Sequence, residues 1–214
     1  MTTQATSVAE HSESDRTEVD VVCAGDSITG WNNYGPVQYW PYPTYPSFLQ
    51  ELCEPLNLRI ADGGIAGEVS DNGLGHVQRY VDLFPDSRYF TIGFGTNDLG
   101  TYPDLKSTSN RIIDNLDSMA MAVIEQGKIP LIFNIPYANE AMFPTSIARD
   151  THEKRDYHNA KLNEYCQQKD IPLADVCSCL TDEHFGDELH PNATGAKTIA
   201  ERVFEILKVV HGAG

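Results

Sequence analysis

The sequence predicts an α/β fold in which a parallel sheet is covered by helices on both faces. Five short apolar runs, rich in β-branched and aromatic residues, recur along the chain. Amphipathic helical patterns lie between several of them, and Gly or Pro closes most of the runs as a turn. Strands that alternate with helices form right-handed βαβ units, which place helices on both sides of the sheet.

Each apolar run is predicted to be a buried strand of a five-stranded parallel sheet. The runs cover residues 19–23, 58–61, 88–92, 129–135 and 171–175. The carboxyl ends of parallel strands meet at one edge of the sheet, and the sites of such folds form beyond that edge. Ser27, Gly64 and Asn97 follow the first three strands. We therefore expect these three residues to converge.

Helices are predicted from apolar residues at helical spacing. One stripe ends before Gly127 and consists of Ile112, Ile113, Leu116, Met119, Ala120, Val123 and Ile124. The last helix covers residues 192–210, with Asn192 as its N-cap. Its buried face is predicted to be Ile199, Val203, Phe204, Ile206, Leu207 and Val210. Residues 153–169 have the pattern of a more polar surface helix.

The chain is most simply one domain, because 214 residues are enough for one full core. Residues 1–18 are polar and acidic without an apolar centre, which predicts a disordered tail rather than a signal peptide, followed by a single domain over 19–214. The five cysteines are odd in number and fit reduced thiols. We expect a cytoplasmic protein, or a secreted one if a targeting segment has been removed.

The strongly acidic charge excludes several classes of partner. The chain has 31 acidic and 15 basic residues, a net charge of −16. A nucleic-acid surface needs basic clusters, and so does adhesion to an anionic membrane, so neither partner is expected. No apolar stretch reaches transmembrane length. No phosphate-binding loop and no His-Glu-x-x-His helix occurs, so we expect neither a cofactor nor a metal. The sequence leaves the oligomeric state open.

A nucleophile, a base and an orienting acid can be read from two blocks of the sequence. Ser27 lies in a Gly-Asp-Ser turn directly after the first strand. A serine hydroxyl is a poor nucleophile unless a base accepts its proton. Of seven histidines, His190 is the one with an acid three residues before it, Asp187. Pro191 stiffens this loop, so the carboxylate can orient the ring. Taken alone, Ser27 fits a helix cap better than a nucleophile, and the Asp-His pair fits an incidental surface loop better than a catalytic pair.

Two further blocks provide hydrogen-bond donors for an oxyanion. Gly64 allows its backbone N–H to approach a reacting oxygen, Asn97 offers a side-chain amide, and the Ser27 N–H is a third donor. Ordinary turn chemistry is the alternative reading of Gly64 and Asn97. Asp26 and Asp98 belong to the same blocks and are expected to hold the loops.

These four blocks resemble those of the SGNH, or GDSL, hydrolase family. The resemblance lies in Ser27, Gly64, Asn97 and His190 with their neighbouring motif residues, and it extends over about residues 19–210. It implies a three-layer, flavodoxin-like α/β/α sandwich, one catalytic domain over 19–214, and serine esterase or lipase chemistry without a cofactor. The chain departs from the family at Asp62, where the family usually has Asn.

An unusual aromatic segment, residues 30–46, directly follows the nucleophile and contains six aromatic residues and four prolines. It could form a wall that stacks on a sugar or lines an acyl pocket, or its rings could pack on their own domain or on a partner subunit. A second rim is predicted at residues 137–150. The predicted wall is Trp31, Tyr34, Tyr39, Trp40, Tyr42 and Phe143.

The blocks together predict a serine esterase that works through an acyl-enzyme intermediate. Short acyl groups are expected, with acetyl esters of carbohydrates as candidate substrates, because an aromatic wall suits sugars. Two alternatives stay open. One is acyl transfer to another alcohol by the same residues, and the other is a catalytically silent carbohydrate-binding or assembly module, because fold does not imply function.

Overall fold

The sheet of the protein is entirely parallel. The computed structural model describes residues 6–7, 19–31, 40–136, 138–139, 142 and 145–212. The strand order is β1-β3-β2-β4-β5-β6, with every neighbouring pair parallel. The strands are β1 (Thr6–Ser7), β2 (Val21–Gly25), β3 (Ile60–Gly64), β4 (Tyr89–Gly93), β5 (Ile129–Phe133) and β6 (Leu173–Ala174).

The five predicted strands are confirmed as β2 to β6. Counted from β2, their order is 2-1-3-4-5, which is the flavodoxin-like order. Three of them run further toward the site than predicted, because the ladder continues through the glycines that were expected to end them. Gly25 pairs with Gly64 on one side and with Gly93 on the other.

The sixth strand, β1, corrects our expectation for the N-terminal segment. Thr6 and Ser7 lie within residues 1–18, which were predicted to be disordered, yet they pair with Ala61 and Asp62 of β3. Composition did not reveal this strand because two residues form no apolar pattern. The free backbone groups of β3 at the sheet edge provide the pairing partners. The other residues of this segment lie outside the described residues.

Six α-helices surround the sheet in the part of the chain that the structure describes. They are α1 (Tyr45–Cys53), α2 (Ser70–Leu83), α3 (Thr96–Thr101), α4 (Leu105–Ile124), α5 (Thr145–Lys169) and α6 (Ala193–Gly212). Two short 3-10 helices accompany them, Glu54–Leu56 after α1 and Asp182–His184 before α6.

The three predicted helices are confirmed as α4, α5 and α6. Asn192 caps α6 through its Oδ1, which accepts the N–H groups of Thr194 and Gly195. Helix α5 begins before the predicted residue 153 and is not wholly a surface helix, because His158 and Leu162 are fully buried. Ile124, predicted as part of the apolar stripe of α4, is exposed.

The sequence interpretation did not anticipate α2, partly because it contains two glycines, which are poor helix formers. The structure explains one of them. A Cβ on Gly73 would lie 2.4 Å from Cε of Met119, so glycine lets α2 pack closely on α4. Tertiary packing therefore overrides the local preference at this position.

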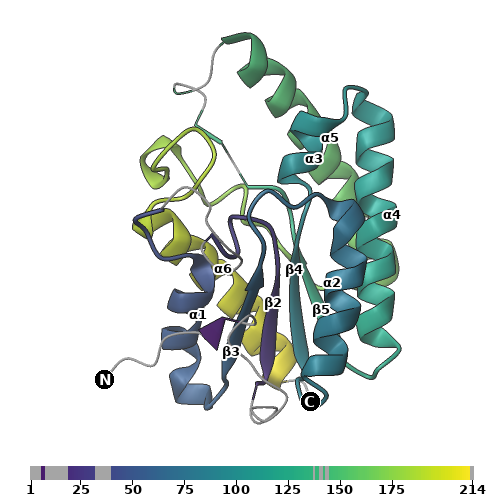
Figure 1. The fold of residues 1–214 in the computed structure, drawn as a ribbon, viewed down its shortest axis with the longest axis vertical. Helices are drawn as coiled ribbons and strands as arrows, with labels where there is room; N and C mark the ends of the chain where they lie inside the picture. Colours follow the sequence, from purple (N-terminus) through teal and green to yellow (C-terminus); the bar gives the residue numbers. More distant parts are fainter. Residues whose placement is uncertain are drawn as a thin grey trace.

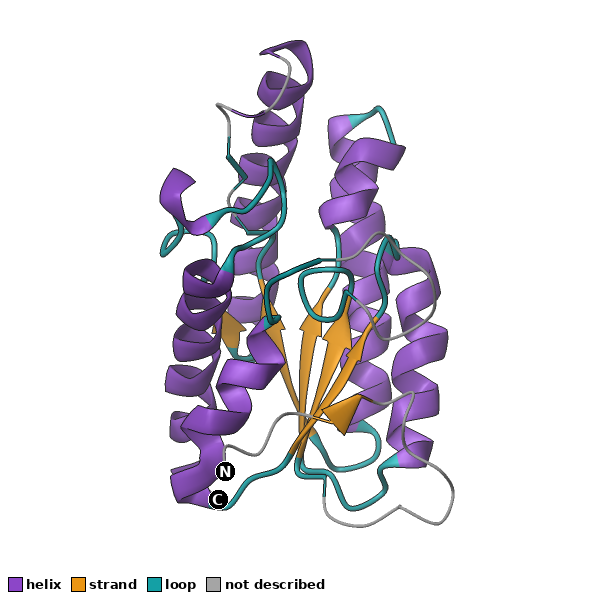
Figure 2. Cartoon of the chain, turned by 60° about the vertical axis from the view of Figure 1, so that its left-hand side comes forward, coloured by secondary structure: helices purple, strands orange, loops and turns teal. Residues whose placement is uncertain are grey.

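The helices form two layers with the sheet between them (Figures 1 and 2). Helices α1 and α6 cover one face, and α2, α4 and α5 cover the other. Alternate residues of one strand enter different cores. In β2, Val22 and Ala24 pack toward α2 and α4, and Val21 and Cys23 pack toward α1 and α6. The predicted three-layer α/β/α sandwich is thus confirmed.

Three of the five cysteines are buried, one in each layer. Cys23 lies in β2, Cys53 in α1 and Cys166 in α5. Burial raises the pKa of each of these thiols to about 12. All five cysteines are free thiols.

The reversal of strand order fixes the place of the site. Strands β2 and β4 are neighbours, but the chain leaves β2 toward α1 on one face and β4 toward α3 and α4 on the other. In folds of this kind a crevice opens beyond the carboxyl ends of two such strands. Ser27 follows β2 and Asn97 follows β4, so both stand at the carboxyl ends of these two strands.

Candidate active site

The nucleophile turn, residues 26–30, is held by Asp26. Its backbone carbonyl accepts the N–H groups of Thr29 and Gly30, and its Oδ1 accepts the N–H of Ile28 at 3.0 Å. The backbone N–H of Ser27 takes no part in these bonds and has no acceptor among the described residues. Ser27 is 5% exposed. The turn thus presents a nearly buried hydroxyl and a free backbone donor at one residue.

Ser27, His190 and Asp187 lie in one hydrogen-bonded line. Ser27 Oγ is 3.0 Å from Nε2 of His190, and Nδ1 of the same ring is 2.8 Å from Oδ2 of Asp187. A proton on Nδ1 satisfies the carboxylate and leaves Nε2 as an acceptor for the serine hydroxyl. The structure therefore brings together the three residues that are separated by up to 163 positions in sequence.

The carboxylate of Asp187 is held ionised by its own loop. Its Oδ1 accepts the backbone N–H groups of Leu189 at 2.8 Å and His190 at 2.6 Å. Burial acts to raise the pKa of Asp187, but the hydrogen bonds from His190 and Leu189 outweigh it and hold that pKa below its usual value. An ionised carboxylate in this position orients the imidazole and favours its protonated form.

The loop that carries His190 is closed on itself and anchored to the rest of the domain. The N–H of Gly186 donates to the carbonyl of His190, and Phe185 pairs with Pro191 across the loop. A second anchor is the N–H of Asn139, which donates to the carbonyl of Glu188 at 3.0 Å. These bonds hold the loop in place and so fix the position of the His190 imidazole next to Ser27.

Asp26 has a second property besides holding the turn. Its side chain is fully enclosed, and Oδ2 has no partner among the described residues. Burial raises the pKa of Asp26 to about 7, against the lowering effects of the Ile28 N–H and the nearby His190. The predicted loop-holding role of Asp26 thus coexists with a carboxyl group that changes charge near neutral pH.

Asn97 and Gly64 differ in how well they suit an oxyanion. Asn97 Nδ2 donates to the carbonyl of Glu68 at 2.8 Å, and an amide has a second hydrogen to offer. The N–H of Gly64, in contrast, donates to Oδ1 of Asp62 at 3.0 Å. A Cβ on Gly64 would lie 2.0 Å from the backbone nitrogen of Gly30. The glycine at 64 therefore serves close packing of β3 against the nucleophile turn.

Gly67, which the sequence interpretation did not select, has the features expected of a backbone donor. Its φ of +80° is the left-handed conformation that favours glycine, and nothing lies within 4 Å of the position that a Cβ would occupy. Its N–H has no acceptor among the described residues. The next residue, Glu68, is the one whose carbonyl holds Asn97. Gly67 is the third glycine of the block Asp62-Gly63-Gly64-Ile65-Ala66-Gly67, and this was the available sequence signal.

The predicted aromatic wall lies partly against the loop that carries His190. The ring centroids of Trp31 and His190 are 4.2 Å apart in an edge arrangement, and Trp40 lies 5.3 Å from the same imidazole. Tyr42 contacts Trp40 edge-on and is 39% exposed. A Cβ on Gly186 would lie within 3.0 Å of Trp40 and Tyr42, so these rings pack on the His190 loop. The predicted Tyr34, Tyr39 and Phe143 lie outside the described residues.

Other features of the described residues lie away from this site. A cavity of about 400 Å³ at the ends of β5 and β6 is lined by Asn134, Asn159 and Asp175 among others, and no predicted site residue lines it. Over the described ranges, no cluster of three His, Cys, Asp or Glu side chains is arranged to bind a metal. No helix there has the length and apolarity needed to cross a membrane.

Comparison with protein families and solved structures gives one consistent result. Residues 23–198 match the GDSL-like lipase/acylhydrolase family. Comparison with curated proteins finds no match. Similar structures include an aryl esterase from M. smegmatis, with 16% identity, a TM-score of 0.73, and 89% of this chain and 99% of that chain covered.

Two further structures show the same fold. A carbohydrate acetylesterase from Sinorhizobium meliloti has 15% identity and a TM-score of 0.69, with 90% of this chain and 100% of that chain covered. A GDSL-like lipase from Bacteroides thetaiotaomicron has 22% identity and a TM-score of 0.65, with 89% and 88% covered. At these identities the likeness establishes the architecture.

Proposed function

The chain belongs to the GDSL-like lipase/acylhydrolase family and is a carboxylic ester hydrolase, and from this premise we propose that it cleaves short-acyl esters through an acyl-enzyme on Ser27. The observation that carries the proposal is the line of two hydrogen bonds from Ser27 Oγ through His190 to Asp187. A serine next to a base that is itself oriented by a carboxylate is the arrangement that nucleophilic acyl transfer requires.

Acylation begins when Ser27 Oγ attacks the ester carbonyl carbon and its proton passes to His190 Nε2. The imidazolium that forms is stabilised by Asp187. The tetrahedral intermediate then collapses, the bond to the alcohol oxygen breaks, and the leaving alcohol takes the proton back from Nε2. Trp31 and Trp40 pack against the His190 ring, and the side chain of His190 is 15% exposed.

The negative charge on the carbonyl oxygen is stabilised by three donors. We propose the N–H of Ser27, the second amide hydrogen of Asn97 and the N–H of Gly67, because these donors follow the carboxyl ends of β2, β4 and β3 and have no other acceptor among the described residues. Gly64, our expectation from the sequence, is replaced in this proposal because its N–H is bonded to Asp62.

Deacylation repeats these steps with water as the nucleophile. His190 Nε2 takes a proton from the water as it attacks the acyl carbon, and the same donors hold the oxyanion. When the acyl–oxygen bond breaks, the proton returns to Ser27 and a carboxylic acid is released. Each atom and proton is accounted for without a cofactor.

Acetyl esters of carbohydrates are our preferred substrate class. Trp31, Trp40 and Tyr42 place aromatic rings around the base, and such rings stack well on sugars. One structural neighbour is a carbohydrate acetylesterase, which supports the same class. The exposed ring of Tyr42 is the part of this wall best placed to meet the alcohol portion of a substrate.

A substrate panel tests the proposal. Aryl esters of two to eight acyl carbons and a set of acetylated sugars are incubated with the wild-type chain and with Ser27→Ala. We expect hydrolysis to fall as the acyl chain lengthens, acetate release from at least one acetylated sugar, and no turnover by Ser27→Ala. Addition of a competing alcohol separates hydrolysis from acyl transfer by the product that forms. A preference for the longest acyl chains would refute the short-acyl proposal.

A further inference from the structure

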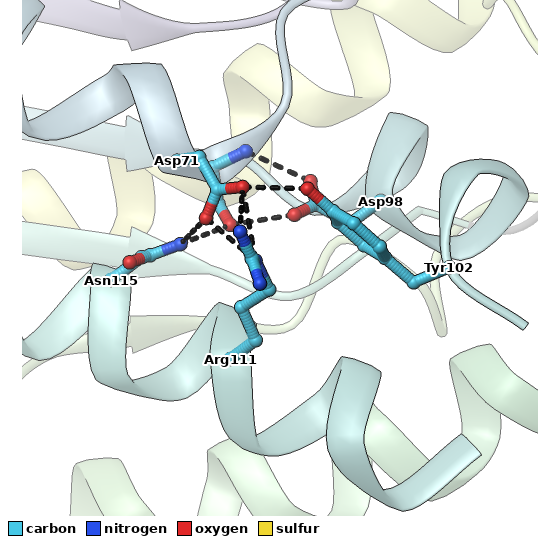
Figure 3. A network of polar contacts seen from close by, with 6 residues as sticks. Asp71, Asp98, Tyr102, Arg111 and Asn115 are labelled. Atoms are coloured by element: carbon cyan, nitrogen blue, oxygen red, sulfur yellow. Dashed lines mark hydrogen bonds and ion pairs between the residues drawn. The ribbon is translucent and has the colours of Figure 1, made fainter. Parts of the chain in front are cut away.

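Resting on the proposed oxyanion role of Asn97, we propose that Asp71 and Arg111, far from the nucleophile in sequence, are positioning residues for that amide. They belong to a polar network of Ser70, Asp71, Asp98, Tyr102, Arg111 and Asn115 that ties together α2, α3 and α4 (Figure 3). We call these six residues the Asp71 network. Substitution of Asp71 or Arg111 should change kcat through Asn97 rather than through stability.

The inner part of the network is a cap on α2. This helix has no capping side chain of its own, because its N-cap residue is Val69. Asp98 of α3 takes this role, with Oδ2 accepting the N–H of Ser70 at 2.9 Å and Oδ1 accepting the Ser70 hydroxyl at 2.6 Å. Asp98 is fully buried. The start of α2 and the residue next to Asn97 are therefore joined rigidly.

The outer part of the network is centred on the Asp71 carboxylate. Arg111 of α4 donates to it from Nε and Nη2, Tyr102 donates its hydroxyl at 2.6 Å, and Asn115 donates at 2.9 Å. The guanidinium of Arg111 also lies over the Tyr102 ring. The hydrogen bond from Arg111 holds the pKa of Asp71 far below its usual value, so the pair stays charged at every working pH.

Two connections lead from this network to the oxyanion donors. Asn115 Nδ2 donates to the Ser70 hydroxyl at 2.8 Å, which links the outer carboxylate to the cap on Asp98. Asn97 directly precedes Asp98, and its Nδ2 donates to the carbonyl of Glu68, two residues before Ser70. These hydrogen bonds thus hold the α3 segment with Asn97 and the turn with Gly67 in fixed positions relative to each other. Arg111 connects both segments to α4.

The exposure of the ion pair argues against a mainly stabilising role. The side chain of Asp71 is 28% exposed and that of Arg111 is 50% exposed. Ion pairs this close to solvent contribute little to folding stability. The same pair can still matter for the reaction, because small displacements of an oxyanion donor cost rate without unfolding the protein.

The test compares Arg111→Gln with a matched exposed pair. Arg202 bonds to Glu205 on α6, on the opposite face of the sheet, with 39% of the Arg202 side chain exposed. Sites competent for reaction are counted with a phosphonate probe, so that kcat refers to folded enzyme. We expect Arg111→Gln to lower kcat on an aryl acetate about tenfold with KM nearly unchanged, and Arg111→Lys to recover part of it. Arg202→Gln should keep kcat, and both Gln variants should melt at similar temperatures.

A double-mutant cycle with Asn97→Ala separates this inference from the proposed function. If Arg111 acts through Asn97, Arg111→Gln should lower kcat less than twofold in the Asn97→Ala background. An equal, tenfold loss in both backgrounds would overturn the inference and leave the oxyanion role of Asn97 standing. A wild-type kcat in Asn97→Ala alone would overturn both. A loss of Arg111→Gln activity that is explained by fewer titratable sites would assign Arg111 to folding.

Discussion

Replacement of Gly64 by alanine tests why glycine is required where β3 meets the nucleophile turn. An added Cβ would lie 2.0 Å from the nitrogen of Gly30, and 2.6 Å from its Cα and from the carbonyl carbon of Thr29. All three are backbone atoms of the turn that carries Ser27. No side-chain rotation can relieve the overlap, so either the strand end or the turn must move.

The size of the effect follows from the depth of this overlap. Overpacking of a core typically costs 1–3 kcal/mol, and a clash with fixed backbone belongs at the upper end, so we expect about 3 kcal/mol. For a chain of this length each kcal/mol lowers the melting temperature by roughly 2–4 °C. Gly64→Ala should therefore melt about 6–12 °C below the wild type.

Thermal unfolding followed by circular dichroism measures this shift, and Gly75→Ala is the matched control. Gly75 lies in α2 with nothing within 4 Å of an added Cβ, and alanine is the better helix former, so this variant should melt at or above the wild-type temperature. A Gly64→Ala protein that melts within about 1 °C of the wild type would refute the packing argument.

Four further predictions concern the site itself. A phosphonate probe should label Ser27 and abolish activity, and a fully active Ser27→Ala would exclude it as the nucleophile. Asn97→Ala should lower kcat about 10²–10³-fold with little change in KM; a change confined to KM would assign it to substrate binding. His190→Ala should lower kcat as much as Ser27→Ala does. The double variant should lower kcat little further, and Asp187→Asn should lower it less than either single variant. Losses of kcat that multiply in the double variant would contradict a single catalytic unit. Folding raises the pKa of Asp26 to about 7, so the folded state is favoured while this carboxyl is protonated. That contribution to the free energy of unfolding is lost as pH rises from about 4 to 7. Asp26→Asn should therefore raise the melting temperature more at pH 8 than at pH 4, and equal shifts at the two pH values would contradict this.

The sheet and the hydrogen-bonded line from Ser27 through His190 to Asp187 could be predicted because their signals are local. Each five-residue strand overlaps one apolar run, and the acid, base and serine stand in short loops with recognisable neighbours. The expected convergence of Ser27 and Asn97 followed from parallel strands alone. The replacement of Gly64 by Gly67 as a proposed donor could not be predicted in the same way, because it depends on which N–H group already has an acceptor.

The remaining misses involve partners far apart in sequence. Arg111 lies 40 positions from Asp71, and no local pattern marks the pair. The sequence of the aromatic segment does not decide its role, because Trp31 and Trp40 contact the imidazole of His190, which lies far along the chain. Helix α2 was hidden by glycines, one of which is needed for packing against α4. In each case tertiary contacts, rather than local preference, decide the structure.

The three buried cysteines can report local unfolding of the protein. Thiolates react with alkylating reagents and enclosed thiols do not, so modification at Cys23, Cys53 or Cys166 must wait for the surrounding segment to open. Because one of these atoms sits in the sheet and one in each helical layer, the order in which they are alkylated at rising temperature would reveal which layer detaches first. The native chain therefore carries its own reporter in every layer, and no engineered label is needed.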